Sequence, residues 1–370
     1  MDVHASAVSE NDREPLVRVE GLTRRFGERL AVAELSFEVG RGELFGLVGP
    51  DGAGKTTTLR MLAGVLRPSA GDAWIGGGAA YRDAGASSAA GRDALANGDA
   101  DRGSRRRGSR RGASVAREPE AVKRHLAYMS QRFGLYTDLT VRENLAFYAD
   151  LYDVPRRELP ARLERLFAFS GLGPFQDRLA GQLSGGMKQK LGLSCALVHE
   201  PELLLLDEPT FGVDPVSRRE LWRIVHERVA EGVTAIVSTA YLDEAERFDR
   251  VALLHEGRLL ALDTPEGLQR SLDEEVLEVR VDEPQRAREV LRSLPGESGG
   301  GGLVRRATAY GARLHVAVEP PAERAAAAVE AALREAGIEP GGIEQVPPSL
   351  EDVFLARVEA PPAERATGAA

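Results

Sequence analysis

Long apolar runs are missing from this 370-residue sequence. The longest, such as residues 203–206, fall far short of the about 20 residues that a membrane-spanning helix needs, and no signal-peptide pattern opens the chain. The sequence therefore predicts a protein that is not itself embedded in a membrane. We expect it to be cytoplasmic.

Cysteine is also scarce, and the chain carries no net positive charge. The single cysteine, Cys195, cannot form an intramolecular disulfide, and it lies between Ser194 and Ala196 in an apolar helical stretch. That setting favours core packing over catalysis. The formal net charge of -9 argues against nucleic acid as the main partner, because proteins that bind phosphate backbones usually carry a positive excess.

The residues that are present describe a folded α/β protein. Hydrophobic residues make up 43% and charged residues 28%, and the length suggests a larger and a smaller domain. Continuous apolar segments at 203–206 and 234–238 are typical of buried parallel strands, and helical patterns alternate with them. The predicted segments are a flexible N-terminus (1–14), a main domain (15–268), a small α+β domain (269–358) and a flexible tail (359–370).

One segment inside the main domain has a different composition. Residues 79–116 consist largely of Gly, Ala, Ser, Asp and Arg, which cannot bury enough apolar surface to fold alone. We predict a disordered surface insertion there. Its arginines at 105–107, 110 and 111 could contact anionic lipid headgroups, although a solvated segment without a fixed role is the simpler interpretation.

A phosphate-binding loop is the strongest motif. The segment GPDGAGKTT lies between a predicted strand and a predicted helix, with glycines, lysine and threonine at the required offsets. Its backbone amides can surround a phosphate, Lys55 can neutralise phosphate oxygens, and the Thr56 hydroxyl can ligate magnesium. The predicted nucleotide-binding residues of this loop are Gly49, Pro50, Asp51, Gly52, Ala53, Gly54, Lys55, Thr56 and Thr57.

Two carboxylates follow a buried strand in the segment LLLLDEP. Asp207 is predicted to hold the metal through water, and Glu208 to act as the general base toward an attacking water. Acidic pairs at strand ends are also common on protein surfaces. This pair is therefore interpreted as catalytic only because the phosphate loop is also present.

The segment LSGGM at residues 183–187 leads into a helix that we expect to begin at about Lys188. With the phosphate loop and the acidic strand, it makes the chain resemble an ATP-binding cassette. The resemblance implies a P-loop NTPase fold with a mainly parallel sheet and a helical subdomain at residues 132–182. It also implies that Ser184, Gly185 and Gly186 contact the γ-phosphate held by a second cassette, in a head-to-tail dimer.

Further positions match the family one by one. Phe26 occupies the place of an aromatic residue that stacks on adenine, although a core aromatic would show the same pattern. Gln131 matches a glutamine that touches magnesium and the attacking water, with a solvent-exposed polar residue as the alternative. Asp214 matches an aspartate that communicates across the dimer. The implied cofactors are ATP and Mg²⁺.

One position departs from the family pattern. Where the family has a histidine that bonds the γ-phosphate, this sequence has Ala240. Losing one preorganised hydrogen bond to a transition state typically slows a reaction by about 10²- to 10³-fold, although Ser238, Thr239 or Tyr241 could compensate. Slow hydrolysis and simple tolerance of the alanine both remain open.

The tail SLEDVFLARV at residues 349–358 resembles the last helix of ATPase subunits from type 2, drug-resistance exporters. The resemblance implies an ATPase on the inner face of the cell membrane, coupled to a separate permease through residues 132–182, including Phe133 and Tyr136. A second ATPase subunit and a periplasmic adaptor are the other implied partners. The alternatives are a regulatory cassette with impaired hydrolysis and a soluble cassette protein outside transport.

Overall fold

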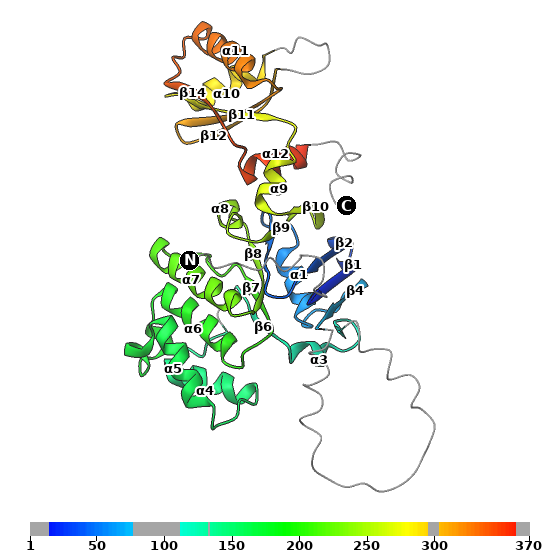
Figure 1. Cartoon of the computed structure of the whole chain (residues 1–370), viewed down its shortest axis with the longest axis vertical. Coiled ribbons are helices and arrows are strands. Elements are labelled where there is room, and N and C mark those ends of the chain that lie inside the picture. Colours follow the sequence, from blue (N-terminus) through cyan, green and yellow to red (C-terminus); the bar gives the residue numbers. More distant parts are fainter. Residues whose placement is uncertain (1–14, 77–111, 132–133, 295–302, 360–370) are drawn as a thin grey trace, which may run out of the picture. The chain divides into compact units, whose positions relative to one another are not determined.

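The computed structural model describes residues 15–76, 112–131, 134–294 and 303–359 (Figure 1). The chain divides into two compact units, residues 1–241 with 248–259 and residues 242–247 with 260–370. The predicted main domain extended to residue 268, so the observed division differs from it by the segment 242–247 and by residues 260–268. The predicted flexible ends at 1–14 and 360–370 lie outside the described residues.

A largely parallel sheet forms the centre of the first unit. Its strands β3, β7 and β8 are buried at every position, which their continuous apolar sequences require when both faces of a sheet are covered. The pairs β3–β8, β3–β9, β6–β7 and β7–β8 are parallel. This confirms the predicted α/β class. In spatial order the strands are β10 (Arg258–Asp263), β9 (Arg250–His255), β3 (Leu44–Val48), β8 (Thr234–Thr239), β7 (Leu203–Asp207) and β6 (Leu126–Met129).

An antiparallel sheet accompanies it, in the order β2 (Arg29–Val39), β1 (Val17–Phe26), β4 (Ala70–Ile75) and β5 (Ala113–Ser114). The predicted insertion ended at residue 116, but Ala113 and Ser114 form strand β5 of this sheet. Ala113 is fully buried, and the Ser114 hydroxyl donates to the Asp72 carboxylate at 2.6 Å. Small residues held by a buried carboxylate carry no apolar pattern, so composition alone could not separate them from the insertion. Residues 79–111 lie outside the described part of the chain.

Three helices of the first unit, α4 (Val141–Leu151), α6 (Gly185–Leu197) and α7 (Pro215–Ala230), begin at side-chain caps. Thr140 and Glu143 form a capping box at the start of α4, and Ser184 and Asp214 cap α6 and α7 with their side-chain oxygens. The helix α6 thus begins at Gly185, earlier than the predicted start at Lys188. The helical elements are α1 (Lys55–Leu62), α3 (Pro119–Lys123), α4 (Val141–Leu151), α5 (Leu159–Ser170), η2 (Gly173–Phe175), η3 (Ala180–Gln182), α6 (Gly185–Leu197) and α7 (Pro215–Ala230).

The second unit contains a βαββαβ arrangement. Its four strands are all antiparallel and lie in the order β12-β13-β11-β14, which is the order of a ferredoxin-like fold. The elements are α8 (Leu242–Ala245), α9 (Pro265–Arg270), β11 (Glu275–Arg280), α10 (Pro284–Arg292), β12 (Val304–Tyr310), β13 (Arg313–Val318), α11 (Ala322–Glu335), β14 (Gly342–Val346) and α12 (Leu350–Glu359).

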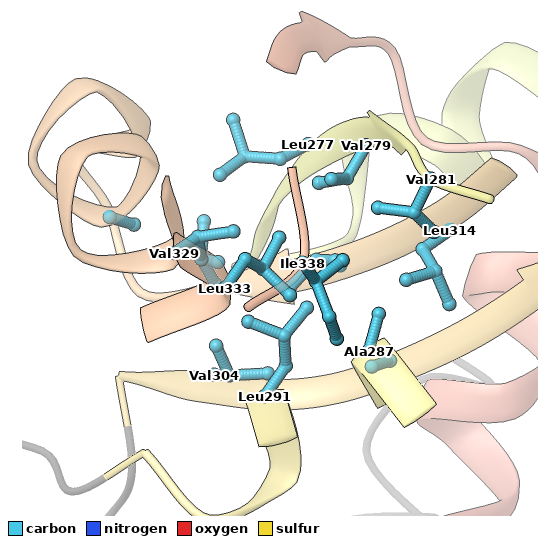
Figure 2. Packing of buried hydrophobic residues seen from close by; sticks show 14 of the residues in the cluster. Leu277, Val279, Val281, Ala287, Leu291, Val304, Leu314, Val329, Leu333 and Ile338 are labelled. Carbon is cyan, nitrogen blue, oxygen red and sulfur yellow. The ribbon is translucent and has the colours of Figure 1, made fainter. Parts of the chain in front are cut away.

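One apolar core holds this fold together. Val279 and Val316 of the sheet, Leu291 of α10 and Val329 and Leu333 of α11 are all fully buried in a single cluster. Figure 2 shows side chains from the helices and from the sheet pointing toward one another. Both helices therefore cover the same face of the sheet.

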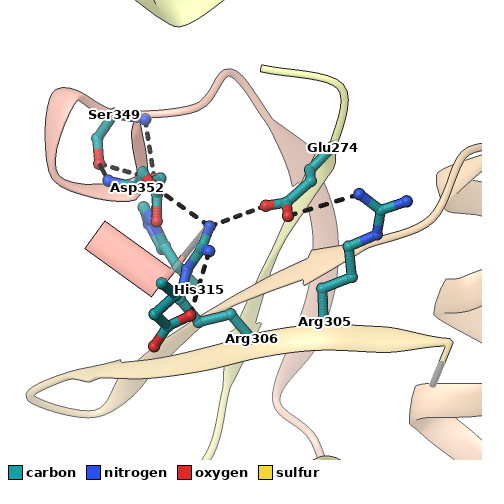
Figure 3. Close-up of polar contacts among 7 residues, drawn as sticks. Glu274, Arg305, Arg306, His315, Ser349 and Asp352 are labelled. Atoms are coloured by element: carbon teal, nitrogen blue, oxygen red, sulfur yellow. Dashed lines mark hydrogen bonds and ion pairs between the residues drawn. The ribbon is translucent and has the colours of Figure 1, made fainter. Parts of the chain in front are cut away.

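The first turn of α12 is held by buried polar side chains (Figure 3). The Asp352 carboxylate, 2% exposed as a residue, accepts from His315 Nδ1 at 3.0 Å and from the Ser349 backbone N–H at 2.9 Å. Arg306 donates to Glu274 at 2.9 Å and to the Asp352 backbone carbonyl at 3.3 Å. Ser349 and Asp352 also form a reciprocal pair, since the Ser349 hydroxyl accepts from the Asp352 N–H at 3.2 Å.

Candidate active site

Two glycines of the loop between β3 and α1 lie so close to neighbouring backbone that no side chain would fit at either position. A Cβ atom on Gly49 would lie 2.1 Å from the Leu254 carbonyl oxygen, and one on Gly54 would lie 2.7 Å from the Ala31 carbonyl oxygen. Gly54 also has φ of 98°, in the left-handed region that glycine adopts without strain. The helix α1 begins at the next residue, so its first backbone N–H groups are available to an anion.

Lys55 is the buried cation of this loop. Its ammonium group donates to the carbonyl oxygens of Gly49 at 2.8 Å and Pro50 at 3.1 Å, and it lies 3.3 Å from Glu208 Oε1. The lysine side chain is only 4% exposed. These contacts fix the position of the Lys55 charge at the base of the loop.

Asp207 ends β7 and is 1% exposed. Its Oδ1 accepts from the Thr56 hydroxyl at 2.9 Å and from the Ser238 hydroxyl at 2.7 Å, and its Oδ2 accepts from the Tyr128 hydroxyl at 3.1 Å. Three donors compensate the buried carboxylate, since burial without partners would be costly. Two of the three residues predicted to contact the metal, Thr56 and Asp207, therefore lie side by side, while the third, Gln131, contacts Glu208.

Glu208 adopts a left-handed backbone conformation, with φ of 49°. Such a conformation costs a non-glycine residue about 1–2 kcal/mol and persists where surrounding contacts enforce it. Here the Glu208 N–H donates to the Ser238 hydroxyl at 3.0 Å and to the Ser238 carbonyl at 3.1 Å. The carboxylate accepts from Gln131 Nε2 at 2.8 Å, so both predicted catalytic residues are in contact.

Phe26 and the phosphate loop share one cavity of about 470 Å³. The Phe26 ring is 47% exposed, and the Arg24 guanidinium lies 4.5 Å from its centroid. A partly exposed, positioned ring is suited to stacking on a flat base. The residues that line the cavity are Phe26, Arg29, Ala31, Asp51, Gly52, Ala53, Gly54, Lys55, Thr56, Thr57, Gln131 and Glu208.

The signature residues do not line this cavity. Ser184 caps α6, its hydroxyl accepting from the Met187 N–H at 3.3 Å, and both Ser184 and Gly185 are exposed. Gly186 packs against α7, where a Cβ atom would lie 2.2 Å from the Ser217 hydroxyl oxygen. Within the described residues of one chain, the signature is thus an exposed helix start with open space at Gly185.

Asp214 likewise stands apart from the cavity and caps α7. Its carboxylate accepts from the N–H groups of Ser217 at 3.0 Å and Val216 at 3.1 Å. The bonds from Ser217 lower the pKa of Asp214, which stays ionised near neutral pH. The structure gives this residue a helix-capping role, and communication across a dimer stays a prediction.

Ala240 is exposed directly after the last residue of β8. The neighbouring hydroxyls are engaged: Ser238 donates to Asp207, and Thr239 accepts from the Tyr241 N–H at 3.0 Å. No histidine lines the nucleotide cavity formed by the described residues. Ser238 therefore contacts the Asp207 carboxylate and the Glu208 backbone N–H.

Tyr128 is a site residue that the motifs did not indicate. It lies on β6 beside Leu205 of β7, and its hydroxyl reaches Asp207. Burial and the nearby carboxylate raise the pKa of Tyr128 to about 12, so the phenol keeps its proton near neutral pH. Its position three residues before Gln131, on a strand ending at the same sheet edge as Asp207, is the sequence signal that could have identified it.

Replacing Tyr128 with phenylalanine is expected to lower the hydrolysis rate about fivefold to tenfold, since Asp207 loses one hydrogen bond of about 1 kcal/mol. Nucleotide affinity should hardly change, because Tyr128 does not line the cavity. Steady-state phosphate release and fluorescent-nucleotide titration separate the two effects. An unchanged rate would show that Tyr128 does not position Asp207.

None of the helices in the described ranges combines the length and the apolar character that a bilayer crossing requires.

Known proteins similar to this chain are ATP-binding proteins of ABC transporters. Residues 32–211 match the family described as ABC transporter. A "Probable multidrug ABC transporter ATP-binding protein YbhF" from Escherichia coli (strain K12) is 46% identical over 259 residues, which cover 70% of this chain. The chain spans only 39% of that relative's length.

Other relatives match over most of both chains. A "Daunorubicin resistance ATP-binding protein DrrA2" from Streptomyces coeruleorubidus is 33% identical over 92% of this chain and 94% of its own. Among solved structures, an "ATP binding subunit of ABC transporter" is 29% identical, with a TM-score of 0.55 over 69% of this chain and 92% of that one. The two alternatives, a regulatory cassette and a cassette protein outside transport, are not favoured by these matches.

This chain belongs to the ABC transporter family, as an ATP-binding cassette protein. Cassettes of this family bind nucleotide. The predicted family is thereby confirmed.

Proposed function

We propose that this chain hydrolyses ATP to drive a drug-efflux transporter whose membrane-spanning permease is a separate polypeptide. The observation that carries the proposal is the convergence of Lys55, Glu208 and Gln131 on one cavity beside a phosphate loop, with Asp207 bonded to Thr56 of the cavity wall. The test is phosphate release by the purified chain with Mg²⁺ and ATP. Nucleotide binding without measurable release would contradict a hydrolytic role.

The residues suit in-line attack of water on a terminal phosphate. Lys55 places a positive charge where negative charge develops, and Glu208 is placed to accept the proton of the attacking water. The hydrogen bond from Gln131 orients the Glu208 carboxylate. We propose that the base stacks on Phe26 and that the reaction takes place at Glu208 and Gln131 of the same cavity.

Magnesium fits the oxygens that Thr56 and Asp207 present. A hydroxyl and a carboxylate 2.9 Å apart are hard ligands of the kind that Mg²⁺ prefers, and Mg²⁺ usually keeps waters and substrate phosphates as its remaining ligands. No cluster of three acidic, histidine or cysteine side chains suited to a metal occurs in the described ranges, which agrees with a metal bound largely through the nucleotide. The ion would neutralise phosphate charge.

The signature supports a shared active site. Ser184 and Gly185 are exposed outside the chain's own nucleotide cavity, at a capped helix start that can meet an anion. We propose that they contact the γ-phosphate bound by a second cassette, and that this chain's own nucleotide is completed in the same way. The second cassette is either another copy or a different chain.

A patch of exposed apolar side chains on the helical part of the first unit supports permease docking. Tyr136, Phe147 and Leu151 are 44%, 38% and 59% exposed, and the rings of Tyr136 and Phe147 meet edge to face at 4.5 Å. Asn144 is fully buried and exchanges hydrogen bonds with both backbone groups of Tyr136. The patch is thus rigidly held, as an interface anchor requires. The predicted contact residue Phe133 lies outside the described residues.

Replacing Tyr136 and Phe147 together with serine is expected to weaken permease binding at least about 30-fold, because a single aromatic anchor at an interface contributes about 2 kcal/mol or more. Nucleotide affinity should stay at the wild-type value. The measurement is co-purification with a candidate permease expressed together with this chain, followed by nucleotide titration.

Val65→Ser is the matched control, since Val65 is 64% exposed and lies outside the patch. Equal loss of the permease in the control and in the double variant would show that the patch has no specific role.

The remaining partners follow from this transporter proposal. The cassette would act at the inner face of the cell membrane, held there by its permease. Relatives named for multidrug and daunorubicin resistance support an efflux direction. A periplasmic adaptor belongs to the proposal only where the system spans two membranes.

A further inference from the structure

Arg29 is the first residue of β2 and lies directly opposite Phe26 on β1. Only Gly27 and Glu28 separate them in the chain. Residues directly opposite in an antiparallel pair project to the same face of the sheet, so the guanidinium and the aromatic ring are neighbours. Both line the nucleotide cavity.

The same strand approaches the phosphate loop. The Ala31 carbonyl oxygen lies 2.7 Å from the position of a Cβ atom on Gly54, and Arg29 Nη2 lies 3.8 Å from the corresponding position on Gly52. Arg29 and Ala31 are two residues apart and therefore share one side of the strand. The absence of side chains on the loop glycines is what lets β2, and Arg29 with it, come this close.

Of the basic residues that line the cavity, Arg29 is the one whose charged group is available to bind phosphate. Lys55 and Arg29 are the two basic residues that line the cavity, and Lys55 is already bonded to Gly49, Pro50 and Glu208. Arg29 is exposed, and its side chain makes no hydrogen bond or ion pair with any residue in the described ranges. A guanidinium can bind two phosphate oxygens at once with its fork of N–H groups.

We propose that Arg29 binds the nucleotide through phosphate oxygens near the base end of the phosphate chain. Gln131 and Glu208 mark the γ-phosphate end, and Phe26, which neighbours Arg29, marks the base end. Arg29 therefore contacts phosphates that ADP and ATP share. The assignment rests on the proposed nucleotide-binding function and adds to it a residue outside the phosphate loop.

Titration of the full chain with mant-ATP and mant-ADP tests the assignment. Arg29→Gln is expected to raise both dissociation constants about tenfold, the usual effect of losing a charged hydrogen bond at a partly exposed site. Arg29→Lys should recover part of this loss, because it restores the charge without the fork. Arg25→Gln, on the neighbouring strand β1 and outside the cavity, should bind as the wild type does.

Unchanged affinity of Arg29→Gln for both nucleotides would overturn the assignment. A loss for mant-ATP alone would overturn it too, since Arg29 would then act at the γ-phosphate. Circular dichroism confirms that each variant is folded. Failure of the wild-type chain to bind either nucleotide would instead overturn the proposed function, so the two failures are distinguishable.

Discussion

Replacing Glu208 with glutamine is expected to lower the rate of ATP hydrolysis by about 10²- to 10⁴-fold, the usual contribution of a positioned general base. Glutamine has nearly the same shape and can still contact Gln131, but it cannot accept a proton from water. ATP affinity should be kept or slightly increased, because the variant removes a negative charge 3.3 Å from Lys55 in the phosphate cavity. Phosphate release and mant-ATP titration measure the two quantities.

Glu256→Gln is a matched control for this prediction. Glu256 is also a glutamate in the left-handed region, with φ of 48°, but it is exposed and does not line the cavity. Its replacement should leave hydrolysis at the wild-type rate. If Glu208→Gln hydrolyses ATP within about threefold of the wild type, another group accepts the proton and the proposed mechanism is wrong.

The phosphate loop and the acidic strand could be recognised because each is a local motif. Lys55, Thr56 and Asp207 were therefore expected at one nucleotide site, and Thr56 donates to Asp207 in the structure. Gln131 was expected there from the family resemblance alone, and it contacts Glu208. The exposed signature, separated from the cavity, agrees with its family role in a dimer.

The rest of the site depends on strand pairings that carry no motif. Tyr128 reaches Asp207 because β6 pairs with β7, and Ser238 does so because β8 pairs with β7 in register with Asp207. Arg29 reaches the loop because β2 turns back directly after Phe26. Single side chains on correctly predicted strands could not be assigned to the site until the pairing and register were known.

Replacing Asp352 with alanine is expected to destabilise the second unit by about 3 kcal/mol, because it removes one partner of a buried charged pair. The variant leaves the His315 and Ser349 donors without the carboxylate that accepts from them at 2.7–3.0 Å. Hydrogen–deuterium exchange of the β13 and α12 segments in the full chain measures the effect. Asp273→Ala, which removes an exposed carboxylate of the same unit, is the control and should exchange as the wild type does.

The pH dependence of the stability difference between the wild type and Asp352→Ala shows how much of that difference is electrostatic. The bond with Asp352 raises the pKa of His315 above its usual 6.5, despite partial burial. Burial raises the pKa of Asp352, but the bonds from His315 and Ser349 outweigh this and hold it below the usual 3.8.

A raised histidine pKa stabilises the fold fully below the unfolded value and loses that contribution as pH rises through the folded pKa. A lowered aspartate pKa stabilises it above the unfolded value and loses that contribution as pH falls through the folded pKa. The difference in stability between wild type and Asp352→Ala should therefore be largest between about pH 4 and about pH 6.5 and decrease on either side.

Glu351 and Tyr310 titrate in both proteins, so their contributions to the pH dependence largely cancel in the comparison. A difference that is constant from about pH 3 to about pH 9 would show that Asp352 stabilises α12 by packing and neutral hydrogen bonds alone.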